Sequence, residues 1–448
     1  MESHFRLVVS LSKLAVLNIS SFLDHIQTIS HQHLTMSQQR RTSSTRRRKW
    51  SGLIKHWTLL GLFEIDEGHE FYDLTCMMKS GLSTALQNNK NEPTPTQLSP
   101  DDFTKEETYI HQGFMLQTFA GPVFANLRRS VNISEEEYET SVASSEPYLQ
   151  FISNSKSKAD FFITHDRRFF LKTETKKEIG LLLSNLRIYT EHLHKYPHSL
   201  LVKILGVHRI IISGESKKYF IVMQSVFYPD ESVTARYDIK GCEVGRWSNP
   251  TPKKDQAVVI LKDMNFEGQH IVLGEQRSWL VRQVKIDTAF LRSINVLDYS
   301  LLLAHQPLHE DELDQNHHLA NLVHRTTISV NQKDPTHPCS VSRCTSDEES
   351  DNNSEHKRSE EALHFQDFQQ TQVENRRLLP DYRNPLHVID GPQLRYFVGI
   401  IDIFTEYGFQ KKLENLWKRI KYPRRAFSTV SPSAYSLRFN QWVEGHTK

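Results

Sequence analysis

The chain has 448 residues, of which 38% are hydrophobic and 24% are charged. This is enough apolar material for one large or two modest cores, so we expect a globular protein with disordered parts. Lys and Arg number 55 against 53 for Asp and Glu, so affinity for an anionic partner must come from local charge clusters. Only four cysteines occur, without a regular spacing, which favours a reducing compartment over a disulfide-linked secreted fold.

The amino-terminal region lacks the features of a membrane span. Its longest apolar stretch, residues 5–23, is interrupted by Arg6, Lys13 and Asn18, whereas a spanning helix needs roughly 20 predominantly apolar residues. We therefore expect no transmembrane helix. A secretory signal is not expected either, because these charges fall inside its would-be apolar part. We predict that residues 1–50 form a variable basic tail without fixed structure.

A basic cluster ends this tail. Residues 40–49, RRTSSTRRRK, contain six basic residues in ten, and Trp50, Leu53, Ile54 and Trp57 follow. This order suits contact with an anionic bilayer surface. A solvated tail, or a patch for nucleic acid or nuclear import, is the alternative. No nucleic-acid recognition fold accompanies the cluster, so we expect no nucleic-acid partner.

The next part of the chain predicts the amino-terminal lobe of a kinase-like fold. Residues 51–109 form a flanking segment whose polar, Pro-containing part, 87–107, is expected to be a linker. Residues 113–138 show an apolar period near 3.6 and contain Ser134 followed by three glutamates, which predicts a capped helical portion. Strands are then expected at 160–166, 168–173, 201–212 and 218–227, with a helix at 176–194 between the second and third strands.

The carboxyl-terminal part is interrupted by a segment of different composition. Residues 306–385 are acidic and rich in Ser and Asn, so they are too polar to bury a core and predict a disordered insert. Residues 393–402 form an apolar, strand-like run that ends in a carboxylate, and an amphipathic helical pattern follows it. We expect residues 444–448 to form a short C-terminal tail.

Four runs contain the residue types that phosphoryl transfer from ATP requires: a lysine for the phosphates, carboxylates for magnesium, and a group that orients the attacking hydroxyl. Each run alone is a weak signal, because a lysine ending an apolar strand usually lies at its edge and an aspartate there usually forms a turn. Their order along the chain is the informative observation. The runs are RFFLKT with Lys172, RYDIKG with Asp238 and Lys240, NVLDYSLL with Asp298, and FVGIID with Asp402.

In this order the runs resemble the motif series of the phosphatidylinositol phosphate kinases. LKDMNF matches a further block of the family, and KSKADFF, YDIKGCEVGRW and FSTVSP resemble one branch of it. The resemblance implies an α+β, two-lobed kinase-like fold with an antiparallel sheet in the amino-terminal lobe. It places the kinase domain at residues 110–443, interrupted by the insert at 306–385.

The resemblance also implies roles for single residues. Lys172, Lys240 and Asp298 are expected to be catalytic, with Lys172 on the ATP phosphates. Asp402 and Asp298 are expected to hold Mg²⁺. The remaining residues expected to contact ATP are Asp238, Met223, Lys156 and Lys158.

The loop that would cover the triphosphate departs from the family pattern. Members that catalyse well have a turn of the form Gly-x-Ser-Gly-Ser, whose N–H groups approach the phosphates because glycine lacks a Cβ and accepts positive φ. Here the stretch reads Lys156-Ser157-Lys158-Ala159-Asp160. We expect Asp160 to place a negative charge near the phosphate oxygens, partly offset by the two lysines. Losing one preorganised donor typically costs about 2.7–4 kcal/mol, so the sequence predicts weak activity or a pseudokinase.

A basic amphipathic helix follows Asp402. Within residues 409–425, Leu413, Leu416, Trp417 and Ile420 recur at helical spacing, seven bases surround them, and Glu414 is the one acid. Such a helix suits an anionic membrane surface, and an ordinary core-facing helix is the alternative. The resemblance places the family's activation loop here. It implies that Lys411, Lys412, Lys418 and Arg419 contact lipid, and that Glu414 marks the members that phosphorylate phosphatidylinositol 4-phosphate.

Two functions follow from these expectations. The first is a cytoplasmic kinase, peripherally attached to the plasma membrane, with ATP and Mg²⁺ as cofactors. It would transfer the γ-phosphoryl group to the 5-hydroxyl of phosphatidylinositol 4-phosphate and so form phosphatidylinositol 4,5-bisphosphate. The second is a scaffold that keeps the fold and the basic face, and that binds active type I phosphatidylinositol 4-phosphate 5-kinases at membranes.

Overall fold

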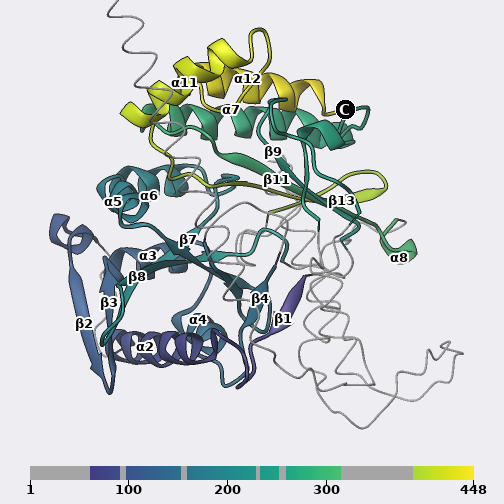
Figure 1. The fold of residues 1–448 in the computed structure, drawn as a ribbon. Coiled ribbons are helices and arrows are strands. Elements are labelled where there is room, and N and C mark those ends of the chain that lie inside the picture. The colour runs from purple at the N-terminus through teal and green to yellow at the C-terminus, as the bar shows by residue number, and fades with distance from the viewer. Residues whose placement is uncertain (1–60, 91–96, 153–158, 229–232, 252–258, 314–386) are drawn as a thin grey trace, which may run out of the picture. The chain divides into compact units, whose positions relative to one another are not determined.

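The computed structural model describes residues 61–90, 97–152, 159–228, 233–251, 259–313 and 387–448. These residues form an α+β fold with two lobes, each built on one sheet (Figure 1). The basic tail of residues 1–50, the loop lysines Lys156 and Lys158, and most of the acidic insert lie outside the described residues.

The amino-terminal lobe contains an eight-stranded sheet in which every neighbouring pair is antiparallel, as expected. The strand runs predicted before and after the 176–194 helix are confirmed in this sheet. In spatial order its strands are β1 (Leu62–Glu64), β4 (Leu149–Phe151), β5 (Phe161–Ile163), β6 (Phe169–Glu174), β8 (Lys218–Gln224), β7 (Ile204–Ile212), β3 (Phe114–Phe119) and β2 (Glu106–His111).

Helices cover both faces of this sheet. On one face, α2 (Tyr72–Lys90) and α4 (Glu135–Val142) pack with Phe169 and Leu171 of β6. On the other face, α3 (Gly121–Ser130), α5 (Lys176–Ser184) and α6 (Leu186–Lys195) pack with Ile221 of β8 and Val207 of β7. Side chains alternate along a strand. Because Leu171 points to the face covered by α2 and α4, its neighbour Lys172 points to the opposite face, which is covered by α3, α5 and α6.

Capping boxes begin two of these helices. Ser134 Oγ accepts a hydrogen bond from the Glu137 amide at 3.1 Å, and the Glu137 carboxylate accepts one from the Ser134 amide at 3.0 Å. This confirms the predicted start of α4. Thr175 and Glu178 make the same reciprocal pair at the start of α5. The helix expected at 176–194 is divided at Asn185 into α5 and α6.

The carboxyl-terminal lobe contains a five-stranded sheet. Its strands in spatial order are β10 (Leu261–Lys262), β9 (Ala235–Ile239), β11 (Ser300–Pro307), β13 (Leu394–Ile401) and β12 (Val388–Asp390). β10 pairs parallel with β9, and the other neighbours are antiparallel. The helices α7 (Arg277–Ser293), α11 (Phe409–Lys421) and α12 (Pro432–Gly445) lie together over one side of this sheet (Figure 1). Shorter elements are α8 (Glu310–Leu313) and the 3₁₀ turns η2 (Pro100–Phe103), η3 (Asp263–Asn265) and η4 (Gly274–Gln276).

One hydrophobic core runs through both lobes. It joins α3 and α6 of the first lobe to β9, β11 and β13 of the second, and to α7 and α12. The segment before β7 also pairs with β13, since the Ile400 amide donates to Leu200 at 2.7 Å and the Val202 amide donates to Ile400 at 2.9 Å. The two sheets are therefore held together next to the ends of their strands.

Three segments differ from the sequence expectations. Residues 114–119, expected to be helical, form β3, because Phe114 and Leu116 alternate into the core while the strand pairs with β7. Within the expected flanking segment and linker, α2 and β2 belong to the first lobe's core and sheet. At the carboxyl end, Thr447 is buried and bridges to Ile271, so the expected tail packs on the fold. Of the helices in the described part of the chain, none has the length and apolar content needed to cross a membrane.

Candidate active site

Strand ends of the second sheet bring three of the expected site residues together. Ile239 pairs with Leu301, and Ser300 pairs with Ile401. Lys240, which follows β9, Asp298, which precedes β11, and Asp402, which follows β13, therefore lie at the same end of the sheet. The fourth residue, Lys172, comes from β6 of the first lobe.

Lys172 and Asp402 meet across the two lobes. The Lys172 ammonium lies 3.0 Å from Oδ1 of Asp402, although the residues are 230 positions apart. Lys172 is also 2.8 Å from Oε1 of Glu174, which belongs to the same strand. The Asp402 side chain is 44% exposed and the Lys172 side chain only 12%. The side chain of Lys172 is thus mostly buried, and its ammonium group reaches the solvent-accessible carboxylate of Asp402.

Asp298 and Lys240 form a second ion pair. The Lys240 ammonium donates to Oδ1 of Asp298 at 3.0 Å and also to the Asp298 carbonyl oxygen. Both Asp298 and Asp402 have positive φ, 65° and 59°. This left-handed conformation is uncommon outside glycine, although Asp and Asn tolerate it better than most residues, and it clusters at functional sites. The Tyr435 hydroxyl donates to the carbonyl of the neighbouring Tyr299, which fixes the backbone beside Asp298.

The charges of the four residues reinforce one another. Burial alone would raise the pKa of Asp298 and of Asp402, but the nearby ammonium groups lower both pKa values below the ordinary value. Conversely, burial would lower the pKa of Lys172 and of Lys240, but the adjacent carboxylates raise both. All four groups are therefore charged at neutral pH.

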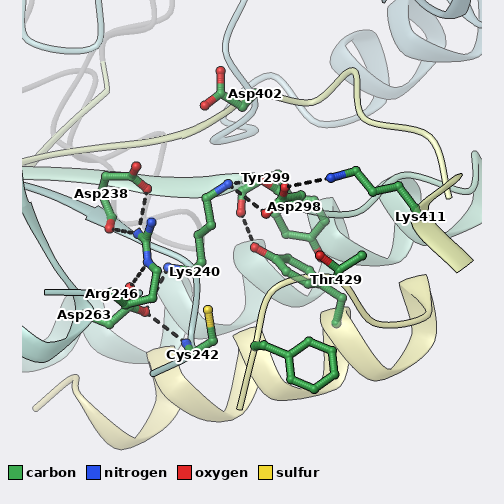
Figure 2. A network of polar contacts seen from close by, with 12 residues as sticks. Asp238, Lys240, Cys242, Arg246, Asp263, Asp298, Tyr299, Asp402, Lys411 and Thr429 are labelled. Atoms are coloured by element: carbon green, nitrogen blue, oxygen red, sulfur yellow. Dashed lines mark hydrogen bonds and ion pairs between the residues drawn. The ribbon is translucent and has the colours of Figure 1, made fainter. Parts of the chain in front are cut away.

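A buried network holds the Lys240 loop in place (Figure 2). Oδ1 of Asp263 accepts hydrogen bonds from the amides of Lys240 at 2.9 Å and Cys242 at 3.1 Å. Arg246 donates to Oδ2 of Asp263 at 2.6 Å and to Oδ1 of Asp238 at 3.0 Å. Burial raises the pKa of the Cys242 thiol to about 12, so the thiol stays uncharged. The network fixes the backbone from which Lys240 reaches Asp298.

The residues expected to contact ATP are placed differently from one another. Met223 of β8 pairs with Phe170, two residues before Lys172. Paired and alternating residues share a face, so Met223 lies on the same face of the first sheet as Lys172. Asp238 is bound to Arg246 instead, on the second sheet. Its charge still helps to raise the pKa of Lys240.

The expectation for Asp160 is wrong. The Asp160 amide donates to Oγ1 of Thr173 at 2.7 Å, and the Thr173 amide donates to the Asp160 carbonyl. Asp160 is thus paired with Thr173, which points to the opposite face of the sheet from Lys172. Burial raises the pKa of Asp160, and the nearby charge of Lys218 opposes this rise. The negative charge of Asp160 therefore lies away from the face that carries Lys172.

Helix α11 turns its apolar side chains to solvent and a polar side chain to the fold, the opposite of an ordinary surface helix. Its one buried residue is the polar Asn415. Its apolar side chains Phe409, Leu413, Leu416, Trp417 and Ile420 are all exposed, Ile420 by 76%. The alternative of a core-facing amphipathic helix is therefore wrong.

Polar contacts hold α11 on the fold. Glu414 contacts Lys418 at 2.5 Å, Lys411 at 3.2 Å and the hydroxyl of the buried Thr429 at 2.8 Å. Lys411 also lies 3.7 Å from Oδ2 of Asp298 (Figure 2). Among the bases expected to contact lipid, Lys411 and Lys418 thus point inward, whereas Lys412 and Arg419 are exposed. Glu414 and Lys411 thus connect the helix to the carboxylate of Asp298.

The two aspartates fit a magnesium site completed by phosphate oxygens. Mg²⁺ in kinases is usually bound by one or two carboxylates together with substrate phosphates. Asp402 and Asp298 are ionised, and their side chains are 44% and 22% exposed. They are the residues that would hold Mg²⁺, whose charge neutralises the phosphates. Lys172 would contact those phosphates from the first lobe.

A sequence profile described as Phosphatidylinositol-4-phosphate 5-Kinase matches residues 142–446. The chain belongs to this family. The family-level resemblance and the fold expected from it are thus confirmed.

Individual relatives extend the similarity over most of the chain. The human phosphatidylinositol 4-phosphate 5-kinase-like protein 1 is 48% identical over 389 residues, which cover 87% of this chain and 90% of that protein. The mouse protein of the same name is 45% identical over 390 residues, with the same two shares. The Arabidopsis thaliana phosphatidylinositol 4-phosphate 5-kinase 3 is 25% identical over 397 residues, covering 85% of this chain and 53% of the plant protein.

Sequence reasoning did not assign roles to three residues at the site. Glu174 contacts Lys172, Arg246 binds Asp263, and Thr429 anchors α11. For Glu174 a signal was present, because residues two apart on a strand share a face. Arg246 and Thr429 lie inside family blocks, but nothing in their local sequence indicates their partners.

Proposed function

We propose that this chain is a phosphoinositide kinase that transfers the γ-phosphoryl group of ATP to the 5-hydroxyl of phosphatidylinositol 4-phosphate. The observation that carries the proposal is that Lys172, Lys240, Asp298 and Asp402 lie together: Lys172 pairs with Asp402, Lys240 pairs with Asp298, and the charges of Lys240 and Asp298 act on Asp402. These residue types match the parts that phosphoryl transfer requires. Family membership supports the same reaction class.

The charges support a division of labour. Lys172 and Lys240 place fixed positive charge where the transferring phosphoryl group gains negative charge, which is the main contribution a protein makes to this reaction. Asp298 is ionised and pairs with Lys240. It therefore suits a role in accepting a hydrogen bond from the substrate hydroxyl and orienting it.

We also propose that α11 brings the site to the cytoplasmic face of the plasma membrane. Its exposed apolar stripe and its outward bases Lys412 and Arg419 suit the headgroup region of an anionic leaflet. Each base near such a surface contributes about 1 kcal/mol. Glu414 lies next to Lys411, which reaches Asp298, so the residue type that marks 4-phosphate substrates lies close to the catalytic carboxylate.

The test is a lipid kinase assay with the full chain. Vesicles containing phosphatidylinositol 4-phosphate and labelled ATP·Mg²⁺ should give phosphatidylinositol 4,5-bisphosphate, and Lys172→Ala should abolish it. Lys285→Ala removes an equally charged but exposed side chain, paired with Glu444, and should leave activity unchanged. Product no greater than that of Lys172→Ala would reject the kinase reaction.

A second candidate is a scaffold that binds active type I kinases of this family at membranes. The absence of both glycines from residues 156–160 favours it, because fixed backbone donors to the triphosphate would be lost. In this role, binding to anionic vesicles and capture of an active relative should persist in Asp402→Asn. If partner capture depends on Asp402, the scaffold role is contradicted.

A further inference from the structure

The ammonium of Lys172 has two carboxylate partners in different surroundings. Asp402 is 44% exposed and comes from the second lobe. Glu174 is only 4% exposed and lies 2.8 Å from the same ammonium. Since Glu174 follows Lys172 by two positions on β6, both side chains lie on the same face of the strand.

Glu174 is itself held by the start of α5. While Glu174 is protonated, its carboxyl group donates a hydrogen bond to the Glu178 carboxylate. Glu178 in turn accepts from the amide and hydroxyl of Thr175, at 2.9 and 2.6 Å. On the other side, β8 places Tyr219 opposite Glu174. Glu174 is thus enclosed by α5 and β8, whereas Asp402 is open to solvent.

The difference matters because an ammonium has three protons to donate. Phosphate oxygens that approach from solvent would reach Lys172 on the side where the exposed Asp402 lies. Glu174 lies on the buried side and keeps its contact. In protein kinases, a glutamate from a helix holds the phosphate-binding lysine in the same way.

We propose that Glu174 is a positioning residue that holds the Lys172 ammonium toward the nucleotide phosphates. The inference rests on the proposed function, since it takes Lys172 as the lysine that binds ATP. The sequence supplies the pairing carboxylate from the same strand instead of from a separate helix. Lys172 is thereby aimed before the nucleotide arrives.

The experiment compares the full-length wild type with Glu174→Gln, Glu174→Asp and Glu444→Gln. Glu444→Gln makes the same chemical change in an exposed pair with Lys285. Burial raises the pKa of Glu174 to about 7. All measurements are therefore made at pH 8, where this carboxyl group is ionised. The groups facing it are Lys172, Glu178 and Tyr219.

The first readout needs no nucleotide. The rate at which acetic anhydride acetylates Lys172 is followed by peptide mass spectrometry. Glu174→Gln should raise this rate several-fold, because removing the adjacent negative charge favours the uncharged amine and frees the ammonium from its buried partner. Glu174→Asp should give an intermediate rate, and Glu444→Gln the wild-type rate. An unchanged rate in Glu174→Gln would overturn the inference.

The second readout is ATP·Mg²⁺ binding, measured from the rise in thermal midpoint with ligand concentration. Glu174→Gln should need about tenfold more ATP·Mg²⁺ for the same rise, as expected for a lost contact to a charged group. Equal or tighter binding in this variant would overturn the inference while leaving the proposed function intact. If the wild type itself shows no rise, the kinase function fails and the nucleotide role of Glu174 fails with it.

Discussion

Removing the hydroxyl of Thr429 should loosen α11 without unfolding the rest of the chain. Thr429 is fully buried, and its Oγ1 donates to Glu414 at 2.8 Å and accepts from Lys418 at 2.9 Å. Its carbonyl accepts from the side chain of Asn415 at 2.6 Å. The change Thr429→Val keeps the shape and the carbonyl contact but removes both contacts of the hydroxyl.

The expected cost follows from the partners that remain. A hydrogen bond to a charged group is worth about 1.5–3 kcal/mol. Glu414 and Lys418 stay paired with each other at 2.5 Å and are partly exposed, so water can replace the lost contacts. We therefore expect a local cost of about 1–2 kcal/mol. This corresponds to amide exchange in α11 that is about 5 to 30 times faster.

Hydrogen–deuterium exchange of peptides from residues 409–421 measures this effect. Thr288→Val is the matched control, because Thr288 is also fully buried and its hydroxyl donates to Asn440 in α12 at 3.1 Å. The control should leave α11 unchanged. The assignment of Thr429 as the anchor would be refuted if α11 exchanged in Thr429→Val at the same rate as in the wild type. It would also be refuted if Thr288→Val accelerated the exchange of α11 equally.

Three further predictions concern the site and the helix surface. Arg246→Met leaves Asp263 buried without its ion partner, so urea unfolding should show a loss of about 3 kcal/mol, and an unchanged midpoint would contradict the network. Folding raises the pKa of Glu174 from 4.5 to about 7, so between these pH values the folded state keeps a proton that the unfolded state has lost. The free energy of unfolding of the wild type should therefore fall by about 3 kcal/mol from pH 4.5 to 7, relative to that of Glu174→Gln. A difference in urea midpoint between the two proteins that stays constant with pH would refute this prediction. Ile420→Ser should leave stability within about 0.5 kcal/mol but reduce sedimentation with anionic vesicles about tenfold, and unchanged sedimentation would argue against membrane contact through α11.

The sequence allowed prediction of the residues whose position follows from the end of an apolar run. Lys240 and Asp402 each follow a strand directly, Asp298 shortly precedes one, and Lys172 lies near the end of β6. Their order along the chain indicated a shared cleft. The register of β9, β11 and β13 aligns the strand ends that carry Lys240, Asp298 and Asp402, and Lys172 joins them from the first lobe through its ion pair with Asp402. Strand ends are readable in the sequence, whereas their register is not.

The remaining features depend on which face of an element meets the core. The sequence predicts Asp160 beside the phosphates, but its pairing with Thr173 places it on the face of the sheet opposite to Lys172. A shift of one residue along a strand moves every side chain to the other face. Likewise, the apolar spacing of residues 409–421 predicts an amphipathic helix but not which side is exposed. Thr429 determines which side is exposed. It lies eight residues beyond the end of the helix and binds the polar face of the helix through Glu414 and Lys418.

The hydrophobic core that runs through both lobes has a consequence for how the molecule unfolds. Neither sheet can lose its packing without exposing apolar side chains of the other, so heating should give a single cooperative transition for residues of both lobes. The same continuity opposes a wide hinge opening between the sheets, since such a motion would admit water beside Leu200 and Ile400. Entry of a nucleotide should then require rearrangement of side chains at the cleft rather than a rotation of one lobe.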